Sequence, residues 1–389
     1  MRICFLVIDG LNDLPIKELK NKTPLEIAKK DTLDFLASQG DYGLVNILNF
    51  APESDEAIFS LLGINLKYYP GRGILEAIGA DLPLIKNAIY FRCNLAKIKK
   101  NQIIDFEAKV DRKKLKIIEN KINKIDIGLN FIFKFIKDYR AVLIFKGKNL
   151  SDKVTNTNPA YLIYKGKFSK ALKRPINKKY FLKKSKAITK KAKFTAKKLN
   201  ELSEKIIDIL KKDNLAILVR GASKVGSWYN KIREKYNYKD WVLISDNIVE
   251  IGIGKILNMK IEKYDYNLKK LAKKVSKILD KKNVYLQIKG PDSCSHRGDF
   301  LGKIREIEKI DKFFLYELVN KIKGKDVLLI ITCDHITSTK YRAHCKGPTT
   351  FIKINMKNIK EIYNTKIKFS EKICKKIIKP KELLKYDIL

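Results

Sequence analysis

Imidazole side chains are scarce in this sequence of 389 residues, so their positions are informative. The chain has 3 histidines, all in its last quarter. His296 lies four residues after Asp292, His335 directly follows Asp334, and His344 lies nine residues further on. An isolated histidine is more often an ordinary core or surface residue, but carboxylates combined with imidazoles are a ligand set for divalent transition-metal ions. The cluster therefore predicts a metal site.

A second set of reactive residues lies near the N-terminus. Asp9 ends a short apolar run, and Ser54 precedes an apolar pattern of helical spacing at residues 57–62. We expect Ser54 at a helix N-terminus, where backbone N–H groups and the helix dipole stabilise an anion. Taken alone, Ser54 is a helix cap. Beside a metal cluster it becomes a candidate nucleophile, because a metal ion lowers the pKa of a hydroxyl group and lets it attack phosphorus.

Three predicted strands of mainly apolar residues, each ending close to one of these aspartates, must position the reactive residues. They cover residues 3–8, which form a continuous apolar run, residues 284–289 and residues 327–332. Continuous apolar runs are typical of strands buried on both faces of a parallel sheet. Thr23-Pro24-Leu25-Glu26 predicts a helix that continues to about Gln39, which supplies the strand, loop and helix order of an α/β fold. Because parallel strands end at one edge of the sheet, where such folds place their sites, the aspartates should converge there.

The middle of the chain has a different character. Residues 66–161 contain short alternating stretches between polar turns, and residues 165–212 are rich in lysine and end in a helical pattern. We therefore predict an α/β, doubly wound domain that is discontinuous in sequence, with an inserted α+β domain. The discontinuous domain covers residues 1–65 and 213–389, with the return near residues 215–219, and the inserted domain covers residues 66–212.

The composition excludes several classes of protein. Hydrophobic residues make up 45% of the chain, which excludes a mainly disordered protein. No run reaches the roughly 18 apolar residues of a membrane span, and residues 3–8 are too few for the apolar region of a signal peptide. The 6 cysteines lack the spacing of a zinc finger or a disulfide framework. We expect a soluble, cytoplasmic protein with no membrane partner.

The strong positive charge invites a nucleic-acid interpretation. With 83 Lys and Arg against 42 Asp and Glu, the formal net charge is +41, and basic residues neutralise phosphates. The excess is mostly scattered lysine, however, and accompanies many Ile, Asn, Tyr and Phe, residue types that share AT-rich codons. No helix-turn-helix, RRM, KH or zinc-finger signature is found. A solvated, compositionally biased surface is the favoured interpretation, and nucleic acid is the less favoured partner.

In combination, these residues and several further motifs resemble a known family over nearly the entire chain. The sequence is similar to the archaeal type of cofactor-independent phosphoglycerate mutase, which belongs to the alkaline phosphatase superfamily. The resemblance is carried by Asp9-Gly10, Lys22-Thr23-Pro24-Leu25-Glu26, Ser54-Asp55, Gly71-Arg72-Gly73 with Glu76-Ala77, Phe91-Arg92-Cys93-Asn94, Leu150-Ser151-Asp152-Lys153-Val154, Lys289-Gly290, Asp292, His296, Gly298-Asp299-Phe300 and Asp334-His335.

The resemblance implies a reaction and a ligand set. It implies that Ser54 accepts the phosphoryl group of 3-phosphoglycerate as a phosphoserine and returns it to the 2-hydroxyl, giving 2-phosphoglycerate in glycolysis and gluconeogenesis without 2,3-bisphosphoglycerate. It also implies two divalent metal ions, Mn²⁺ first, with Co²⁺, Zn²⁺ or Mg²⁺ as alternatives. One ion would be held by Asp9, Ser54, Asp334 and His335, and the other by Asp292, His296 and His344.

The substrate side of the resemblance is less complete. Cationic side chains of the inserted domain would bind the carboxylate and phosphate of a small phosphorylated substrate, since these anions suit Arg in particular. The candidates are Arg72, Arg92, Arg140 and Lys146. The sequence departs from the family pattern at Ile58, at Tyr139, in the stretch that begins at Phe106 and in the stretch that ends at Ala160.

These departures leave other functions open. A phosphotransfer site that admits water becomes a phosphatase. The alternative is therefore a metal-dependent phosphatase or phosphotransferase of the same superfamily that acts on another small phosphorylated metabolite. A basic nucleic-acid-binding protein with a structural metal site is the third possibility. The sequence does not determine the oligomeric state.

Overall fold

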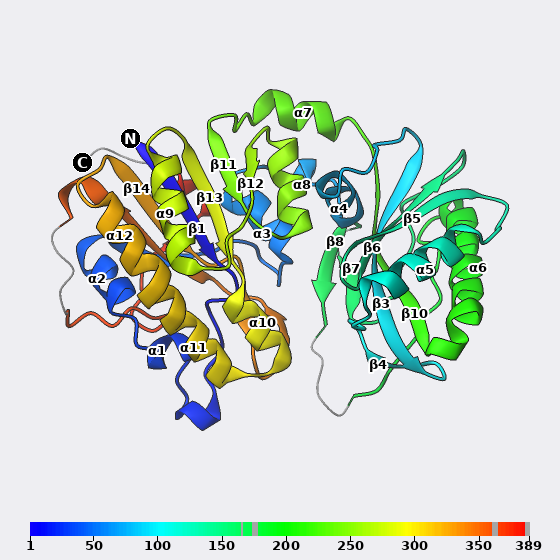
Figure 1. The fold of residues 1–389 in the computed structure, drawn as a ribbon, viewed down its shortest axis with the longest axis horizontal. Coiled ribbons are helices and arrows are strands. Elements are labelled where there is room, and N and C mark those ends of the chain that lie inside the picture. Colours follow the sequence, from blue (N-terminus) through cyan, green and yellow to red (C-terminus); the bar gives the residue numbers. More distant parts are fainter. Residues whose placement is uncertain (165, 173–177, 360–364, 386–389) are drawn as a thin grey trace.

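The computed structural model describes residues 1–389 except 165, 173–177, 360–364 and 386–389. The chain forms two parts, each built on its own large sheet (Figure 1). One sheet has eight strands and takes its residues from both ends of the chain, whereas the other has six strands from the middle. The protein is therefore an α/β protein with a mixed, mainly parallel sheet and a separate antiparallel sheet.

The eight-stranded sheet contains the three strands expected from the apolar runs. Its five strands from β12 to β14 run parallel, β17 is antiparallel to both β14 and β2, and β18 is parallel to β2. The spatial order is β12 (Lys260–Glu262), β11 (Trp241–Ile244), β13 (Asn283–Ile288), β1 (Arg2–Ile8), β14 (Val327–Thr332), β17 (Thr349–Asn355), β2 (Asp41–Val45) and β18 (Ile377–Ile378).

Helices cover both faces of this sheet, which explains why its central strands are apolar throughout. On β1, Leu6 and Ile8 belong to the core on one face, and Phe5 and Val7 belong to the core on the other. The first face packs against α2 (Asp31–Gln39), α9 (Leu268–Leu279), α11 (Phe300–Ile310) and α12 (Tyr316–Ile322). The second face packs against α3 (Ser54–Leu61) and α8 (Ile248–Ile256).

The six-stranded sheet is antiparallel throughout. Helices α5 (Arg112–Asn123) and α6 (Lys193–Leu210) pack on one face and α4 (Arg72–Gly79) on the other. Its strands are β5 (Asn130–Lys137), β6 (Arg140–Lys146), β3 (Ala88–Lys99), β4 (Gln102–Asp105), β9 (Tyr180–Phe181) and β10 (Leu215–Lys224), the last paired with β3. A separate hairpin consists of β7 (Tyr161–Tyr164) and β8 (Phe168–Ala171).

Strand β10 corrects one expectation. We expected the chain to return to the first part near residues 215–219, but β10 pairs with β3 along its length, so the return follows Lys224. Its apolar run is continuous because both faces of this strand are covered: Ile217 and Val219 face one core cluster and Leu218 another. An apolar run of this kind does not require a parallel sheet. The domain ranges themselves stay a prediction.

Helices α4 and α8 cross where the two parts meet. A Cβ added to Gly79 would lie 1.9 Å from the backbone oxygen of Ile248, and one added to Gly252 would lie 2.0 Å from that of Leu75. Only glycine lets the two backbones approach this closely. The contact ties the six-stranded part to the helix layer of the eight-stranded part (Figure 1).

The helix expected from Thr23 to Gln39 is two helices, so that prediction was wrong in its extent. Thr23 and Glu26 form the expected capping box of α1 (Pro24–Ile27). The backbone then leaves the helical region at Ala28, and α2 begins at Asp31. The carboxylate of Asp311 accepts the backbone N–H groups of Thr32 and Leu33, which stabilises a separate helix start.

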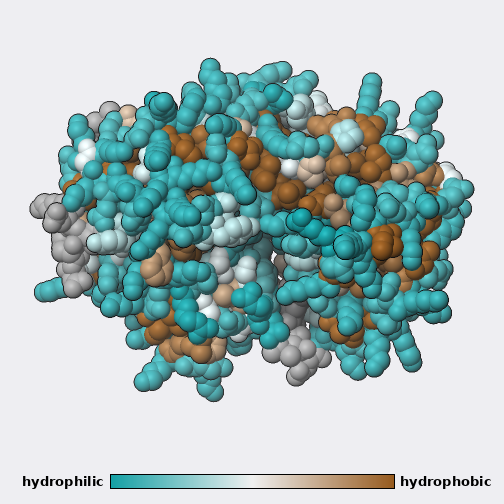
Figure 2. Space-filling view, viewed as in Figure 1, coloured by the Kyte–Doolittle hydropathy of each residue, from teal (hydrophilic) through white to brown (hydrophobic). Residues whose placement is uncertain are grey.

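The remaining elements are short. They are α7 (Trp228–Lys235), α10 (Gly290–Arg297), α13 (Pro380–Leu383), β15 (Ile336–Ser338), β16 (Ala343–Cys345), a π-helical turn (Asp311–Leu315) and 3₁₀ turns at Lys17–Leu19, Leu66–Tyr68, Lys190–Ala192, Lys211–Asp213 and Met356–Asn358. Within the described residues, no helix has the length and apolar character needed to cross a membrane. Hydrophilic side chains cover most of the face seen in Figure 2.

Candidate active site

The carboxyl ends of three neighbouring strands bring the predicted aspartates together. Strands β13, β1 and β14 lie side by side in the sheet, and Asp292, Asp9 and Asp334 follow them in that order. The backbone N–H of Asp292 donates to the carbonyl of Asp9 at 3.0 Å. Gly10 permits this approach, since its φ is +65° and an added Cβ would lie 2.7 Å from Cα of Asp292.

The first group of candidate metal ligands consists of Asp292, His296 and His344. Nε2 of His296 lies 3.2 Å from Nε2 of His344 and 3.4 Å from Oδ1 of Asp292. Nε2 of His344 lies 3.6 Å from the same Asp292 oxygen. Asp292 and His296 lie four residues apart on α10, so they share one helix face, and His344 reaches them from β16.

Hydrogen bonds determine which nitrogen each of these histidines offers. Nδ1 of His344 lies 2.8 Å from the carbonyl of Pro52, and Nδ1 of His296 lies 3.1 Å from that of Arg342. A carbonyl only accepts, so both Nδ1 atoms carry hydrogen and the Nε2 lone pairs face each other. Burial alone would lower the pKa of His344, but Glu53 and Asp292 raise it to about 9. Two such lone pairs at 3.2 Å require a proton or a metal cation between them.

The second group consists of Asp9, Asp334 and His335. Nε2 of His335 lies 3.2 Å from Oδ2 of Asp334, 3.6 Å from Oδ1 of Asp9 and 3.2 Å from Oγ of Ser54. Burial lowers the pKa of His335 well below its usual value, so the ring is neutral and offers a lone pair. Oδ1 of Asp9 is buried and has no hydrogen-bond partner among the described residues.

The charge of this group is only partly balanced. Burial, together with the negative charge of neighbouring carboxylates, raises the pKa of both Asp9 and Asp334. Nζ of Lys289 lies 2.7 Å from Oδ2 of Asp9, and Nε2 of Gln287 donates to the same oxygen at 2.9 Å. Two buried carboxylates thus share one ammonium group, which leaves room for further positive charge.

Both groups fit a divalent cation. Donor atoms at the corners of a tetrahedron with bonds of about 2.0–2.2 Å are separated by about 3.3–3.6 Å. The donor separations given above lie between 3.2 and 3.6 Å in both groups. The donors are carboxylates, imidazoles and a hydroxyl, a mixture suited to Mn, Co, Zn or Mg. The unpartnered oxygen of Asp9 and the facing nitrogens of the histidine pair are the atoms that such ions would satisfy.

Ser54 is the first residue of α3, which confirms its predicted place at a helix N-terminus. It is not the helix cap, because Glu53 caps α3 through a capping box with Glu56. The hydroxyl of Ser54 lies 3.2 Å from Nε2 of His335, at the end of α3 where the first backbone N–H groups have no intrahelical acceptor.

A cleft of about 510 Å³ is lined by Ser54 and by the first ligand group, Asp292, His296 and His344. The structure places Arg72, Arg92 and Arg140 in its lining. Arg72 donates to Asp55 and Glu76 at 2.8 Å each, and Arg92 also pairs with Glu76. Arg72 and Arg92 are therefore linked through Glu76, and Arg72 connects this pair to Asp55 in the first turn of α3. Arg140 lies in the same lining and donates to Asn247 at 3.2 Å.

Lys146 does not belong to this lining. It lies at the opposite end of β6 from Arg140, six residues or about 20 Å along an extended strand. In the sheet it is placed opposite Ala88 and Asn130 rather than in the cleft lining. Its prediction as an anion ligand was wrong, because the strand carries it away from the site.

Sequence reasoning missed Arg220 of β10. Its side chain is 4% exposed, lines the cleft, donates to Glu53 at 3.2 Å, and has its guanidinium 3.7 Å from the ring centre of Tyr161. Nε and Nη1 are buried without a hydrogen-bond partner among the described residues. The signal available in the sequence was an arginine directly after the apolar run 215–219. It was missed because that run was assigned to the eight-stranded part and not to the six-stranded sheet. Lys289, which the sequence offers only as part of the Lys289-Gly290 motif, also lines the cleft.

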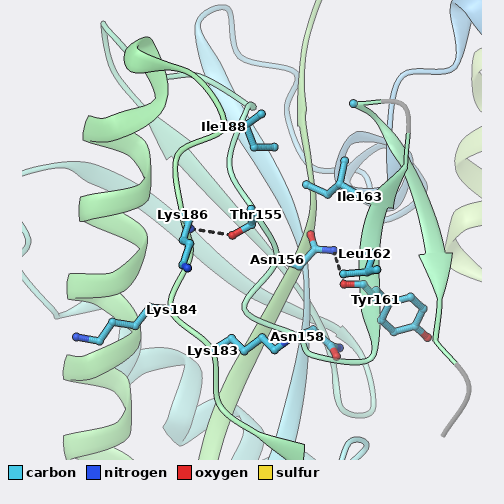
Figure 3. Close-up of a pocket in the computed structure, with 11 residues that line it drawn as sticks. Thr155, Asn156, Asn158, Tyr161, Leu162, Ile163, Lys183, Lys184, Lys186 and Ile188 are labelled. Carbon is cyan, nitrogen blue, oxygen red and sulfur yellow. Dashed lines mark hydrogen bonds between the residues drawn. The ribbon is translucent and has the colours of Figure 1, made fainter.

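The departures from the family pattern lie in different surroundings. Phe106 and Tyr139 line the cleft, whereas Ile58 and Ala160 are buried. A second cavity of about 690 Å³ adjoins the cleft and shares Tyr161 with it (Figure 3). It is lined by lysines and uncharged residues and contains neither ligand group.

Comparison with known proteins identifies the family. A family model described as 2,3-bisphosphoglycerate-independent phosphoglycerate mutase matches residues 37–216. Proteins with that name from Sulfolobus acidocaldarius and Aeropyrum pernix are 31% and 30% identical. The first alignment covers 90% of this chain and 87% of the relative, and the second covers 96% and 94%.

Solved structures share the fold. A protein of Pyrococcus horikoshii matches with a TM-score of 0.68 and 21% identity over 91% of this chain and 87% of its own. The cofactor-independent phosphoglycerate mutase of Thermoplasma acidophilum matches with a TM-score of 0.53 and 23% identity over 97% and 96%. The fold is thus that of a cofactor-independent phosphoglycerate mutase structure. With the sequence matches, the chain belongs to the family of 2,3-bisphosphoglycerate-independent phosphoglycerate mutases.

Proposed function

We propose that this chain interconverts 3-phosphoglycerate and 2-phosphoglycerate, the reaction of its family, by way of a phosphoserine on Ser54 and without 2,3-bisphosphoglycerate. One observation carries the mechanism. The hydroxyl of Ser54 lies at the start of α3, 3.2 Å from His335, between two carboxylate–imidazole groups and a cleft lined by arginines. A nucleophile, an anion-stabilising helix terminus and cationic substrate anchors are the parts that phosphoryl transfer requires.

Two divalent cations fit the ligand groups described above. Asp9, Asp334 and His335 would hold one together with Ser54, and Asp292, His296 and His344 would hold the other. When bound, such cations lower the pKa of the serine hydroxyl and balance the charge of the transferred phosphoryl group. We propose Mn²⁺ as the metal, with Co²⁺, Zn²⁺ and Mg²⁺ as the alternatives that metal analysis would distinguish.

The protein's own residues would bind and orient the substrate. Arg220 has buried N–H groups without acceptors and is the strongest candidate for the substrate phosphate or carboxylate. Arg140 lines the same cleft. Arg72 and Arg92 are already paired with carboxylates. Arg72 would position the start of α3 through Asp55, and both arginines would add positive potential to the cleft.

The fold supports a division of labour between the two parts. We propose that the eight-stranded part is the alkaline-phosphatase-like, doubly wound, discontinuous catalytic domain. The six-stranded part would be the inserted, substrate-handling domain, since it contributes Arg92, Arg140 and Arg220 to the cleft. The glycolytic reaction favours the cytoplasm as the compartment and a small phosphorylated metabolite as the partner.

Retention of the glycerate separates a mutase from a phosphatase. If the glycerate leaves the cleft before the phosphoryl group is returned to it, water captures the phosphoryl group instead. The test is to supply the purified protein with Mn²⁺ and 3-phosphoglycerate and to follow ³¹P resonances. Appearance of 2-phosphoglycerate supports the mutase, whereas inorganic phosphate alone would establish the phosphatase.

Serine substitutions test the nucleophile. Ser54→Ala should abolish phosphoryl transfer while the protein remains folded. Ser60→Ala is the matched control on the same helix, because its hydroxyl donates to the carbonyl of Ile47 and lies outside the cleft lining. Full activity of Ser54→Ala would refute the phosphoserine.

A further inference from the structure

The two ligand groups touch each other, and one uncharged residue lies against both. The rings of His335 and His344, one from each group, stack with their centres 3.6 Å apart. Thr337 lies on β15, directly opposite His344 of β16 in the two-stranded sheet. It is completely buried.

The hydroxyl of Thr337 connects ligands of different groups. It lies 2.9 Å from Oδ1 of Asp292 in the first group and 2.9 Å from Nδ1 of His335 in the second. A hydroxyl has one hydrogen, which it donates to the carboxylate. The oxygen then accepts from Nδ1–H of His335, so Nε2 of that ring keeps its lone pair toward Ser54 and Asp334.

The backbone of Thr337 is held on both sides, so the hydroxyl has a defined position. Its N–H donates to the carbonyl of Asn12 at 3.1 Å. Its carbonyl accepts from Nζ of Lys303 at 3.0 Å. That lysine is completely buried, pairs with Asp13 at 3.0 Å and also donates to the carbonyl of Asn12. The buried ion pair of Lys303 and Asp13 thus holds the backbone of Thr337, whose hydroxyl contacts the two ligand groups.

We propose that Thr337 is a positioning residue that couples the two metal sites. Its hydroxyl selects the tautomer of His335 in one site and orients the carboxylate of Asp292 in the other, so loss of one hydroxyl weakens both. This inference rests on the proposed two-cation site. Partners that orient metal ligands typically change metal affinity about 10- to 100-fold when they are removed.

Metal binding without turnover tests the coupling. The metal-free protein is titrated with MnCl₂, and free Mn²⁺ is counted by electron paramagnetic resonance. Thr337→Val keeps the shape but removes both hydrogen bonds, and Thr337→Ser keeps the hydroxyl. Thr339→Val is the matched control two residues away, because Oγ1 of Thr339 is buried with no hydrogen-bond partner among the described residues.

The expected result is two Mn²⁺ per chain for the wild type, Thr337→Ser and Thr339→Val. Thr337→Val should bind both ions about 10- to 100-fold more weakly. Wild-type affinity in Thr337→Val, loss at one site only, or equal loss in Thr337→Ser would overturn the proposal. A wild type that binds no Mn²⁺ would instead refute the two-cation site on which the proposal rests.

A second readout separates positioning from general destabilisation. With 3 histidines in the chain, ¹⁵N-histidine labelling gives three imidazole systems in the metal-free protein. Thr337→Val should shift only His335 away from its Nδ1–H tautomer. The tautomers of His296 and His344 should not change. Thr337→Ala is the second variant in case valine prevents folding, and it should produce the same shift. An unchanged His335 tautomer in the folded variant would overturn the proposal.

Discussion

Replacement of Arg220 by lysine is the sharpest test of the substrate cleft. Lysine keeps a positive charge near Glu53, whose pKa burial would raise but Arg220 and the nearby histidines lower to about 2. The substitution therefore avoids leaving a buried carboxylate wholly unpaired. It removes the planar guanidinium, whose Nε and Nη1 are buried without acceptors and are available to an oxyanion.

The expected magnitude follows from the number of donors lost. Hydrogen bonds to a charged group contribute about 1.5–3 kcal/mol each. Loss of one or two such bonds costs about 1.5–6 kcal/mol, which corresponds to a decrease in kcat/KM of about tenfold to about 20,000-fold. Because a phosphate or carboxylate is present in both the ground state and the transition state, KM should rise in addition to any fall in kcat.

Steady-state kinetics with 3-phosphoglycerate measures this change, coupled to detection of 2-phosphoglycerate. The matched control is Arg233→Lys, since Arg233 also packs over a tyrosine, Tyr229, but on α7 outside the cleft lining. Both variants are assayed well below their melting temperatures so that only folded protein is compared. If kcat/KM of Arg220→Lys stays within about threefold of the wild type, less than 1 kcal/mol, Arg220 does not bind substrate.

Three further predictions concern the surroundings of the site. Lys146→Met should leave kcat/KM near the wild-type value, because Lys146 lies at the far end of β6; a large rise in KM would contradict this placement. Gly252→Ala should lower the melting temperature markedly, since a Cβ there would lie 2.0 Å from a backbone oxygen of α4; an unchanged melting curve would refute the crossing. Burial alone would raise the pKa of Glu76, but Arg92 and Arg72 lower it to about 2. Relative to a pKa near 4.5 in the unfolded chain, the lowered pKa of Glu76 stabilises the fold by roughly 3 kcal/mol above pH 5. This stabilisation is lost as the pH falls toward 2. Urea titrations of Glu76→Gln should show lower stability at pH 7 and a flatter dependence between pH 5 and 2, and an unchanged acid profile would exclude this role.

Much of the sheet edge was predictable from local patterns. Apolar runs buried on both faces predict parallel strands, and Asp9, Asp292 and Asp334 follow such runs directly or within a few residues. Parallel strands that are neighbours must end at the same edge, so the convergence follows without knowledge of long-range contacts. The scarcity of histidine made the accompanying imidazoles conspicuous.

The cleft-facing cations were harder to predict. In a chain with 83 Lys and Arg, a basic residue carries little information by itself. Whether it faces a cleft depends on its strand's position, register and side of the pleat. Arg140 and Lys146 belong to one strand, yet only Arg140 reaches the site. Arg220 reaches it because β10 pairs with β3 rather than with the parallel sheet.

The sequence by itself thus determined the class of protein, the strand-end carboxylates and the place of Ser54 at a helix start, because these depend on patterns within short segments. Tertiary structure decided the pairing of β10, the exclusion of Lys146, the burial of Arg220 and the link that Thr337 makes between the two ligand groups. These features arise where segments remote in sequence meet. Their distances depend on packing between sheets and helices, which no local pattern encodes.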